Sequence, residues 1–206
     1  MATEYSPLQD NMDKWNTGDI LLFCNKTSCF GKTIKFFTGS SYTHVGMILK
    51  NPTFTNTPLI GLFFWESANE NYNDVEDHKK KLGVEIVDLH ELLRKCGSIE
   101  VYYRKLNFTG TQHIDLNKLK EIHDVVHNKP YDIVPTDWVE AYFKVDPNPQ
   151  KTNRFWCSAL LGYIFVKLGF LPSNIDWSIM RPSDFSSERK DLPLINVQLS
   201  KEVRIQ

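Results

Sequence analysis

The sequence has 206 residues, of which 41% are hydrophobic and 13% aromatic. This composition can bury a sizeable core, and it excludes a mainly disordered chain. Lys and Arg number 24 against 25 Asp and Glu, so the formal net charge is -1. Such a chain has no overall positive field for phosphate backbones, which argues against a dedicated nucleic-acid-binding protein. Because no stretch resembles a linker, we expect a single domain over residues 1–206.

The N-terminal residues 1–14 are polar, and we expect them to form a loose arm. They have neither the basic region nor the apolar region of a secretory signal peptide. The longest apolar stretch, residues 159–171, is interrupted by glycines and a lysine and is too short to span a bilayer. The four cysteines show no CxxC spacing, so we expect reduced thiols in a cytoplasmic protein. They are Cys24, Cys29, Cys96 and Cys157.

The first half of the chain contains apolar runs separated by turn signals, a pattern typical of strands. A short helix is expected between the first two strands, at 31–37, and a polar surface loop at 69–81. The expected strands are 20–23, 44–49, 59–67 and 84–87, the last of them exposed.

The second half is richer in helical patterns. Asp88 can cap a short helix at 89–93, and apolar residues at helical spacing predict a second helix at 115–128. A strongly apolar helix is expected at 155–170, with strands at 99–106 and 194–199 and a connector at 130–153. Several short strands followed by one dominant buried helix predict an α+β domain.

Cys157 stands at the beginning of the most apolar predicted helix, in the stretch Phe155-Trp156-Cys157-Ser158. A thiol there faces unpaired backbone N–H groups and the positive end of the helix dipole. Both favour the thiolate, which is the nucleophilic form. The same N–H groups could hold a developing oxyanion. On position alone, an inert buried cysteine is the better interpretation.

His44 begins a predicted strand directly after a polar loop, where its ring can face a cleft and accept a thiol proton. Glu66 ends the next predicted strand. If the two strands are adjacent and antiparallel, its carboxylate can hold the far nitrogen of the imidazole, as the third member of a triad does. Taken singly, each residue could equally be structural.

Other candidate sites are weaker. His123 and His127 share one helix face at a spacing that can bind zinc, but no third ligand is evident, so no metal site is predicted. Tyr131 could line a cleft ahead of the cysteine helix, and Tyr42 belongs to an aromatic group that would suit an apolar substrate. Both are also explained by ordinary packing.

Four motifs in chain order carry a family resemblance. They are Thr17-Gly18-Asp19-Ile20-Leu21-Leu22, Thr43-His44-Val45-Gly46-Met47-Ile48, Trp65-Glu66-Ser67 and Trp156-Cys157-Ser158. Together they resemble the permuted NlpC/P60 papain-like superfamily, most closely its YiiX/YebB-type branch, which includes relatives in poxviruses and other large DNA viruses. The order histidine, polar residue, cysteine is that of the permuted branch. The resemblance implies a circularly permuted papain-like fold, with a small antiparallel sheet packed against the cysteine helix.

The resemblance also implies a cysteine-dependent hydrolase or acyltransferase that cleaves an amide or ester bond through a thioester. Cys157 would be the nucleophile, His44 the base and Glu66 the residue that orients it, with Tyr131 and Tyr42 as substrate-binding candidates. No cofactor is required. The expected partners are a peptide, amide or lipid-acyl substrate and a peripheral membrane contact, and a viral protein would act in the host cytoplasm or the virion. The alternative is an inactive protein that holds a lipid or peptide in the same cleft.

Overall fold

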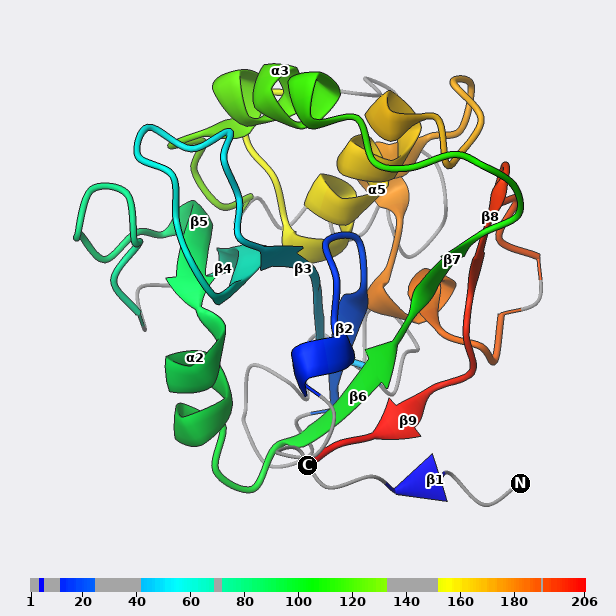
Figure 1. The fold of residues 1–206 in the computed structure, drawn as a ribbon, viewed down its shortest axis with the longest axis horizontal. Coiled ribbons are helices and arrows are strands. Elements are labelled where there is room, and N and C mark those ends of the chain that lie inside the picture. The colour runs from blue at the N-terminus through cyan, green and yellow to red at the C-terminus, as the bar shows by residue number, and fades with distance from the viewer. Residues whose placement is uncertain (1–3, 6–11, 25–41, 69–71, 133–151, 190) are drawn as a thin grey trace.

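The computed structural model describes residues 4–5, 12–24, 42–68, 72–132, 152–189 and 191–206 (Figure 1). The helix expected at 31–37, Cys29 and most of the connector at 130–153 lie outside the described residues.

Seven strands form one sheet in the order β1-β9-β6-β2-β3-β4-β5. Neighbours are antiparallel except β1 and β9, which pair in parallel. The strands are β1 Glu4–Tyr5, β2 Ile20–Cys24, β3 His44–Lys50, β4 Leu62–Ala68, β5 Gly83–Asp88, β6 Glu100–Arg104 and β9 Val203–Arg204. A separate pair is formed by β7 Leu106–Phe108 and β8 Val197–Leu199. The predicted α+β class with an antiparallel sheet is therefore present.

Three α-helices and three 3-10 helices accompany the sheet in the described part of the chain. The α-helices are α2 Leu89–Lys95, α3 Leu116–Val126 and α5 Cys157–Leu168. The 3-10 helices are η2 Met12–Lys14, η3 Trp177–Ile179 and η4 Pro182–Phe185. None of the described helices combines the length and hydrophobicity that crossing a bilayer requires.

Strands β2, β3, β4 and β5 are buried on both faces of the sheet. Helices α3 and α5 lie next to each other on one side of it and α2 lies on the other (Figure 1). Successive residues of a strand point to opposite faces, so each strand contributes to both cores. In β3, Val45 and Met47 pack towards α5 while Ile48 packs in the cluster that contains α2.

Two expectations need correction. The strand expected to be exposed, β5, is buried, because Val84 and Ile86 pack in the α5 cluster while Val87 packs in the α2 cluster. Within the arm expected to be loose, Glu4–Tyr5 forms β1, which pairs in parallel with β9 and is an edge strand of the sheet.

Candidate functional site

His44 and Glu66 come together because β3 and β4 are adjacent and antiparallel, as the prediction required. Met47 pairs with Trp65, and extending this register by one residue sets Gly46 against Glu66. Glu66 is then a diagonal neighbour of His44 on the same face. The His44 Nε2 atom contacts the Glu66 Oε2 atom in a hydrogen bond and ion pair.

Gly46 makes this approach of the two strands possible. A Cβ atom at this position would lie 2.5 Å from Phe64 Cζ and 2.7 Å from the Trp65 carbonyl oxygen. Because real Cβ atoms do not approach other atoms so closely, any side chain here would push β4 away from β3. The glycine in the His44 motif therefore has a packing role next to the site.

The imidazole of His44 is wedged between aromatic rings. Its centroid lies 5.5 Å from that of Phe23 and 6.2 Å from that of Phe64. The His44 side chain keeps 22% of its surface exposed, whereas Glu66 keeps 2%. The carboxylate is thus enclosed, and the ring that it holds reaches solvent.

Cys157 is the first residue of α5, as predicted, because Trp156 has an extended backbone and ends the preceding segment. Two hydrogen bonds hold the segment that leads into α5. The Ser67 hydroxyl donates to the Phe155 carbonyl at 2.7 Å, and the Phe155 N–H donates to the Pro130 carbonyl at 3.1 Å. Ser67 follows Glu66 directly, so two consecutive residues of β4 position the carboxylate and the beginning of the cysteine helix. Cys157 is one of the groups that raise the pKa of His44.

The charge state of His44 follows from these contacts. Burial by itself disfavours the imidazolium, but the negative charges of Glu66 and Cys157 and the hydrogen bonds to both outweigh it and raise the pKa of His44 to about 10. His44 is therefore positively charged throughout the neutral range.

Glu85 is a site residue that the sequence did not reveal. It pairs with Glu66 across β4 and β5 and is 1% exposed. Neither of its carboxyl oxygens has a hydrogen-bond partner among the described residues. Burial, followed by the charges of Glu66 and Asp74, raises the pKa of Glu85 to about 9, so this carboxyl is neutral at neutral pH. The alternating pattern of residues 84–87 predicted an exposed strand, which concealed it.

The two tyrosines differ in position. Burial and then the charges of Cys157, Asp132 and Glu66 hold the pKa of Tyr131 well above its usual range. Tyr42 is buried, and its ring meets that of Tyr102 edge-on at 5.5 Å. Burial raises the pKa of the Tyr42 hydroxyl, and smaller contributions come from Glu202, Glu188, Tyr102 and Cys24. Tyr42 is thus part of the core, and Tyr131 packs against the same core cluster.

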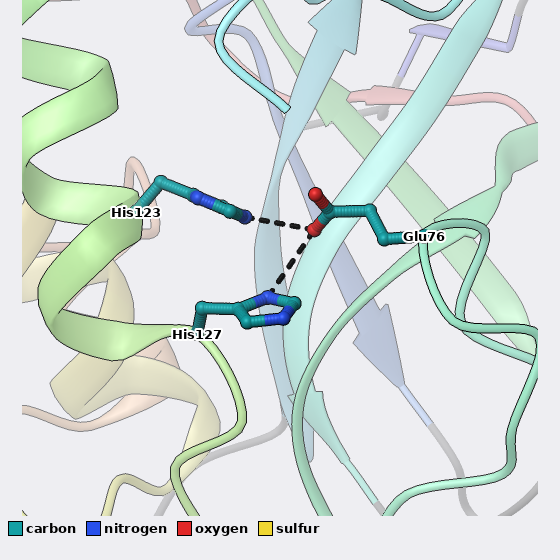
Figure 2. Close-up of side chains that lie close together, drawn as sticks. All are labelled: Glu76, His123 and His127. Atoms are coloured by element: carbon teal, nitrogen blue, oxygen red, sulfur yellow. Dashed lines mark hydrogen bonds and ion pairs between the residues drawn. The ribbon is translucent and has the colours of Figure 1, made fainter. Parts of the chain in front are cut away.

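A second polar cluster lies on α3. Figure 2 shows His123 and His127 pointing at one oxygen of Glu76, the third group that the sequence did not supply. The His123 Nε2 atom lies 2.7 Å and the His127 Nδ1 atom 3.3 Å from Glu76 Oε2. Glu76 was missed because it stands 47 residues before His123, in a segment that the sequence shows only as a charged surface loop.

Comparisons with known proteins show a similar fold but no family for this chain. No protein-family model matches the chain, and no curated protein matches it. Among solved structures, the fold is similar to that of the metalloprotein YiiX from Escherichia coli O157:H7, with a TM-score of 0.48 and 16% sequence identity. The similarity covers 93% of this chain and 96% of the other.

Proposed function

We propose that this protein is a cysteine-dependent hydrolase or acyltransferase that acts on an amide or ester bond. The observation that supports this most is the ion pair of Glu66 with His44, together with the position of Cys157, which acts on the pKa of His44, at the beginning of a buried helix. A nucleophile, a base and a group that orients the base are the set that acyl transfer through a thioester needs.

In the proposed reaction, the Cys157 sulfur attacks the carbonyl carbon of the substrate. The carbon–sulfur bond forms, and the bond to the leaving amine or alcohol breaks as His44 gives that group a proton. Water or an acceptor amine then attacks the thioester, His44 takes its proton, and the thiolate is released. The N–H groups in the first turn of α5 are available to the oxyanion of each tetrahedral intermediate.

Glu66 has the orienting role in this proposal. Because it holds Nε2 of His44, the nitrogen that exchanges a proton with the thiol is Nδ1. Its negative charge also stabilises the imidazolium that forms during each step. The order His44, Glu66, Cys157 along the chain agrees with the permuted papain-like arrangement, which we propose for the fold.

A chromogenic ester such as p-nitrophenyl acetate provides the test, because it reports acylation without knowledge of the natural substrate. We expect a burst of p-nitrophenolate and an acetyl group on Cys157, detected by mass spectrometry of the peptides. Cys157→Ala should abolish both, and His44→Ala should slow acylation by a factor on the order of 10²–10⁴. Glu66→Gln should be milder, since the amide keeps a hydrogen bond to the ring.

The variant Cys96→Ala is the matched control, since Cys96 is also buried but lies after α2. Equal burst amplitudes in the wild type and Cys157→Ala would reject the proposal. A folded protein that is never acylated would instead favour the alternative, a protein that binds a lipid or peptide without turnover.

A further inference from the structure

We propose that Glu76, His123 and His127 form a binding site for a divalent transition-metal ion of the zinc class. This inference is independent of the proposed catalytic reaction. In β4, Trp65 points towards this cluster, with its ring centroid 6.1 Å from that of His123, while the next residue, Glu66, points to the opposite face and His44.

The donor set matches the preference of such ions. Imidazole nitrogens and a carboxylate oxygen are common zinc ligands, and two histidines plus one glutamate leave a fourth position for water. His123 stands in the last turn of α3 and His127 caps its C-terminus, so the end of this helix presents both rings to the same point. The three donors include no thiol, so the proposed metal site does not use Cys157.

The spacing of the donor atoms is close to that of a coordinated set. Two ligands at 2.0–2.1 Å from a tetrahedral ion lie about 3.4 Å apart. The His127 Nδ1 and Glu76 Oε2 atoms are already 3.3 Å apart, and the 2.7 Å between His123 Nε2 and Glu76 Oε2 need open only slightly. All three donor atoms lie within 4.8 Å of one another. Side-chain rotations alone can therefore bring them to coordination distance of one ion, without a change of fold.

The surroundings orient the ligands as metal sites require. The Asn56 N–H donates to Oε1 of Glu76 at 3.1 Å, which leaves Oε2 for an ion. On the far side of the His123 ring, Nδ1 lies 3.8 Å from Asp124 Oδ1, an ion-pair contact that places a carboxylate in the outer shell of this ligand. Phe54 packs against the His123 ring at 5.6 Å and shields it from water.

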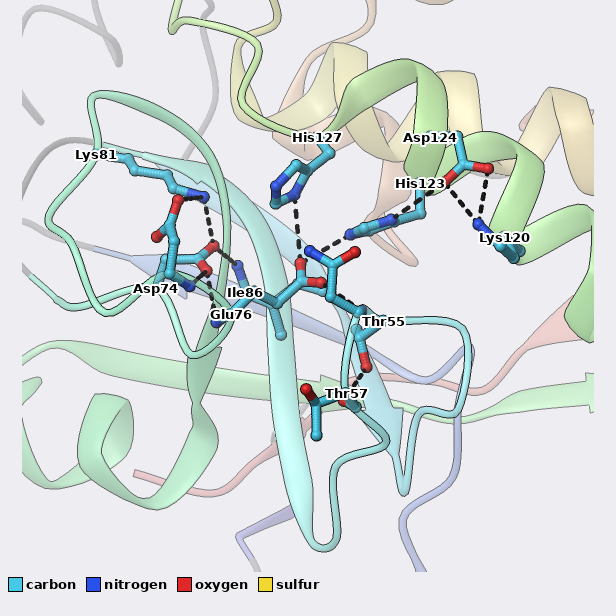
Figure 3. A network of polar contacts seen from close by, with 12 residues as sticks. Thr55, Thr57, Asp74, Glu76, Lys81, Ile86, Lys120, His123, Asp124 and His127 are labelled. Atoms are coloured by element: carbon cyan, nitrogen blue, oxygen red, sulfur yellow. Dashed lines mark hydrogen bonds and ion pairs between the residues drawn. The ribbon is translucent and has the colours of Figure 1, made fainter.

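Asp74 holds the segment that carries Glu76, as Figure 3 shows. One of its carboxylate oxygens accepts the Glu76 N–H at 2.7 Å, and the other accepts the Ile86 N–H of β5 at 3.0 Å. Lys81 forms an ion pair with the same carboxylate at 3.1 Å. Glu76 is thus tied to the sheet before any ion binds, and its side chain is 2% exposed.

The test is a zinc titration of the chelator-treated full-length chain against a chromogenic chelator. It is run in parallel on the wild type and on Cys157→Ser, which removes the thiol as a competing ligand. We expect one zinc ion per chain in both. His127→Asn and Glu76→Gln should each weaken the affinity by more than the roughly 10–100-fold that loss of an outer-shell partner costs. His127→Asn is preferred to a change at His123, because the His127 side chain is 23% exposed and that of His123 only 5%.

His113→Asn is the matched control, since His113 is exposed and lies before α3; it should bind zinc as the wild type does. Cobalt(II) should give ligand-field bands without a thiolate charge-transfer band, and zinc should raise the melting temperature of the wild type but not of Glu76→Gln. Absence of zinc binding would overturn the proposal and leave a hydrogen-bonded cluster. Binding that survives in His127→Asn and Glu76→Gln, or a charge-transfer band that disappears in Cys157→Ser, would also overturn it.

Discussion

At the scale of single residues, the site contains two buried carboxyl groups, Glu66 and Glu85. Glu66 is stabilised by the imidazolium of His44, but Glu85, directly opposite in the sheet, has no such partner among the described residues and stays protonated. A buried carboxyl without a partner is costly to ionise. Glu85 is thus a local source of instability next to the reactive groups.

Replacing Glu85 with Gln should remove that instability. Between its ordinary pKa of 4.5 and the raised value of about 9, the folded chain keeps a proton that the unfolded chain has lost. Stability therefore falls as the pH rises through this range, by roughly 3 kcal/mol near pH 7. Glu85→Gln should be more stable than the wild type at neutral pH and equally stable near pH 4.5, as measured by urea unfolding.

The most informative range is from about pH 5 to 6.5, because the raised pKa of His44 affects stability only above its ordinary value of 6.5. If the wild type and Glu85→Gln lose stability in parallel across this range, Glu85 is ionised in the folded state and its assignment here is wrong.

The three catalytic candidates could be found from the sequence because each stands at the end of an element with a clear pattern. The apolar runs around His44 and Glu66 predict strands, and the apolar helix begins at Cys157. Glu85 and Glu76 could not be found in this way. Their positions depend on strand pairing and on a loop fixed by Asp74, and neither leaves a local signal in the sequence.

At the scale of elements, the separation of β3 and β4 sets the geometry of the site. Gly46→Ala would place a methyl group against Phe64 and the Trp65 carbonyl, and such overpacking costs roughly 1–3 kcal/mol. Because β4 carries Glu66, the variant should lose both stability and esterase activity. Thermal unfolding and the acylation burst measure the two effects.

Gly110→Ala is the control, since a Cβ atom there meets nothing within 4 Å. It should match the wild type in both measurements. A Gly46→Ala protein with unchanged stability and burst would show that the strands can separate without moving Glu66.

At the scale of the whole molecule, Arg104 joins the central sheet to the C-terminal segment. From β6 its guanidinium donates to the carbonyl oxygens of Ser200 at 2.6 Å and Leu199 at 3.1 Å, and also to that of Phe185. Arg104→Met keeps the aliphatic stem but leaves these carbonyls without their donor. We expect a loss of about 3 kcal/mol, since hydrogen bonds to charged groups contribute about 1.5–3 kcal/mol each.

Arg204→Met provides the comparison on a neighbouring strand. The Arg204 side chain is 40% exposed and pairs with Glu100 at 3.4 Å, and exposed ion pairs contribute about 1 kcal/mol at most. Equal losses for the two variants in denaturant unfolding would contradict the bridging role of Arg104.

The fold as a whole was predictable at the level of class and of its main elements. The short strand β9 and its pairing with β1 were not, because two-residue strands have no periodicity to detect. The burial of β5 on both faces was also missed, since it depends on which helices cover the sheet.

The measurement that tests the central claim most directly is the rate of iodoacetamide alkylation at each cysteine as a function of pH, in the wild type and in His44→Ala. Since His44 keeps its positive charge up to about pH 10, we predict that Cys157 alkylates much faster than Cys96 in the wild type and loses most of this reactivity in His44→Ala. Cys96 is the internal reference, because burial and the charge of Glu66 raise its pKa to about 12, and it should react slowly in both proteins. If Cys157 alkylates no faster than Cys96, or equally fast with and without His44, the two residues are not a catalytic pair and the proposed function is wrong.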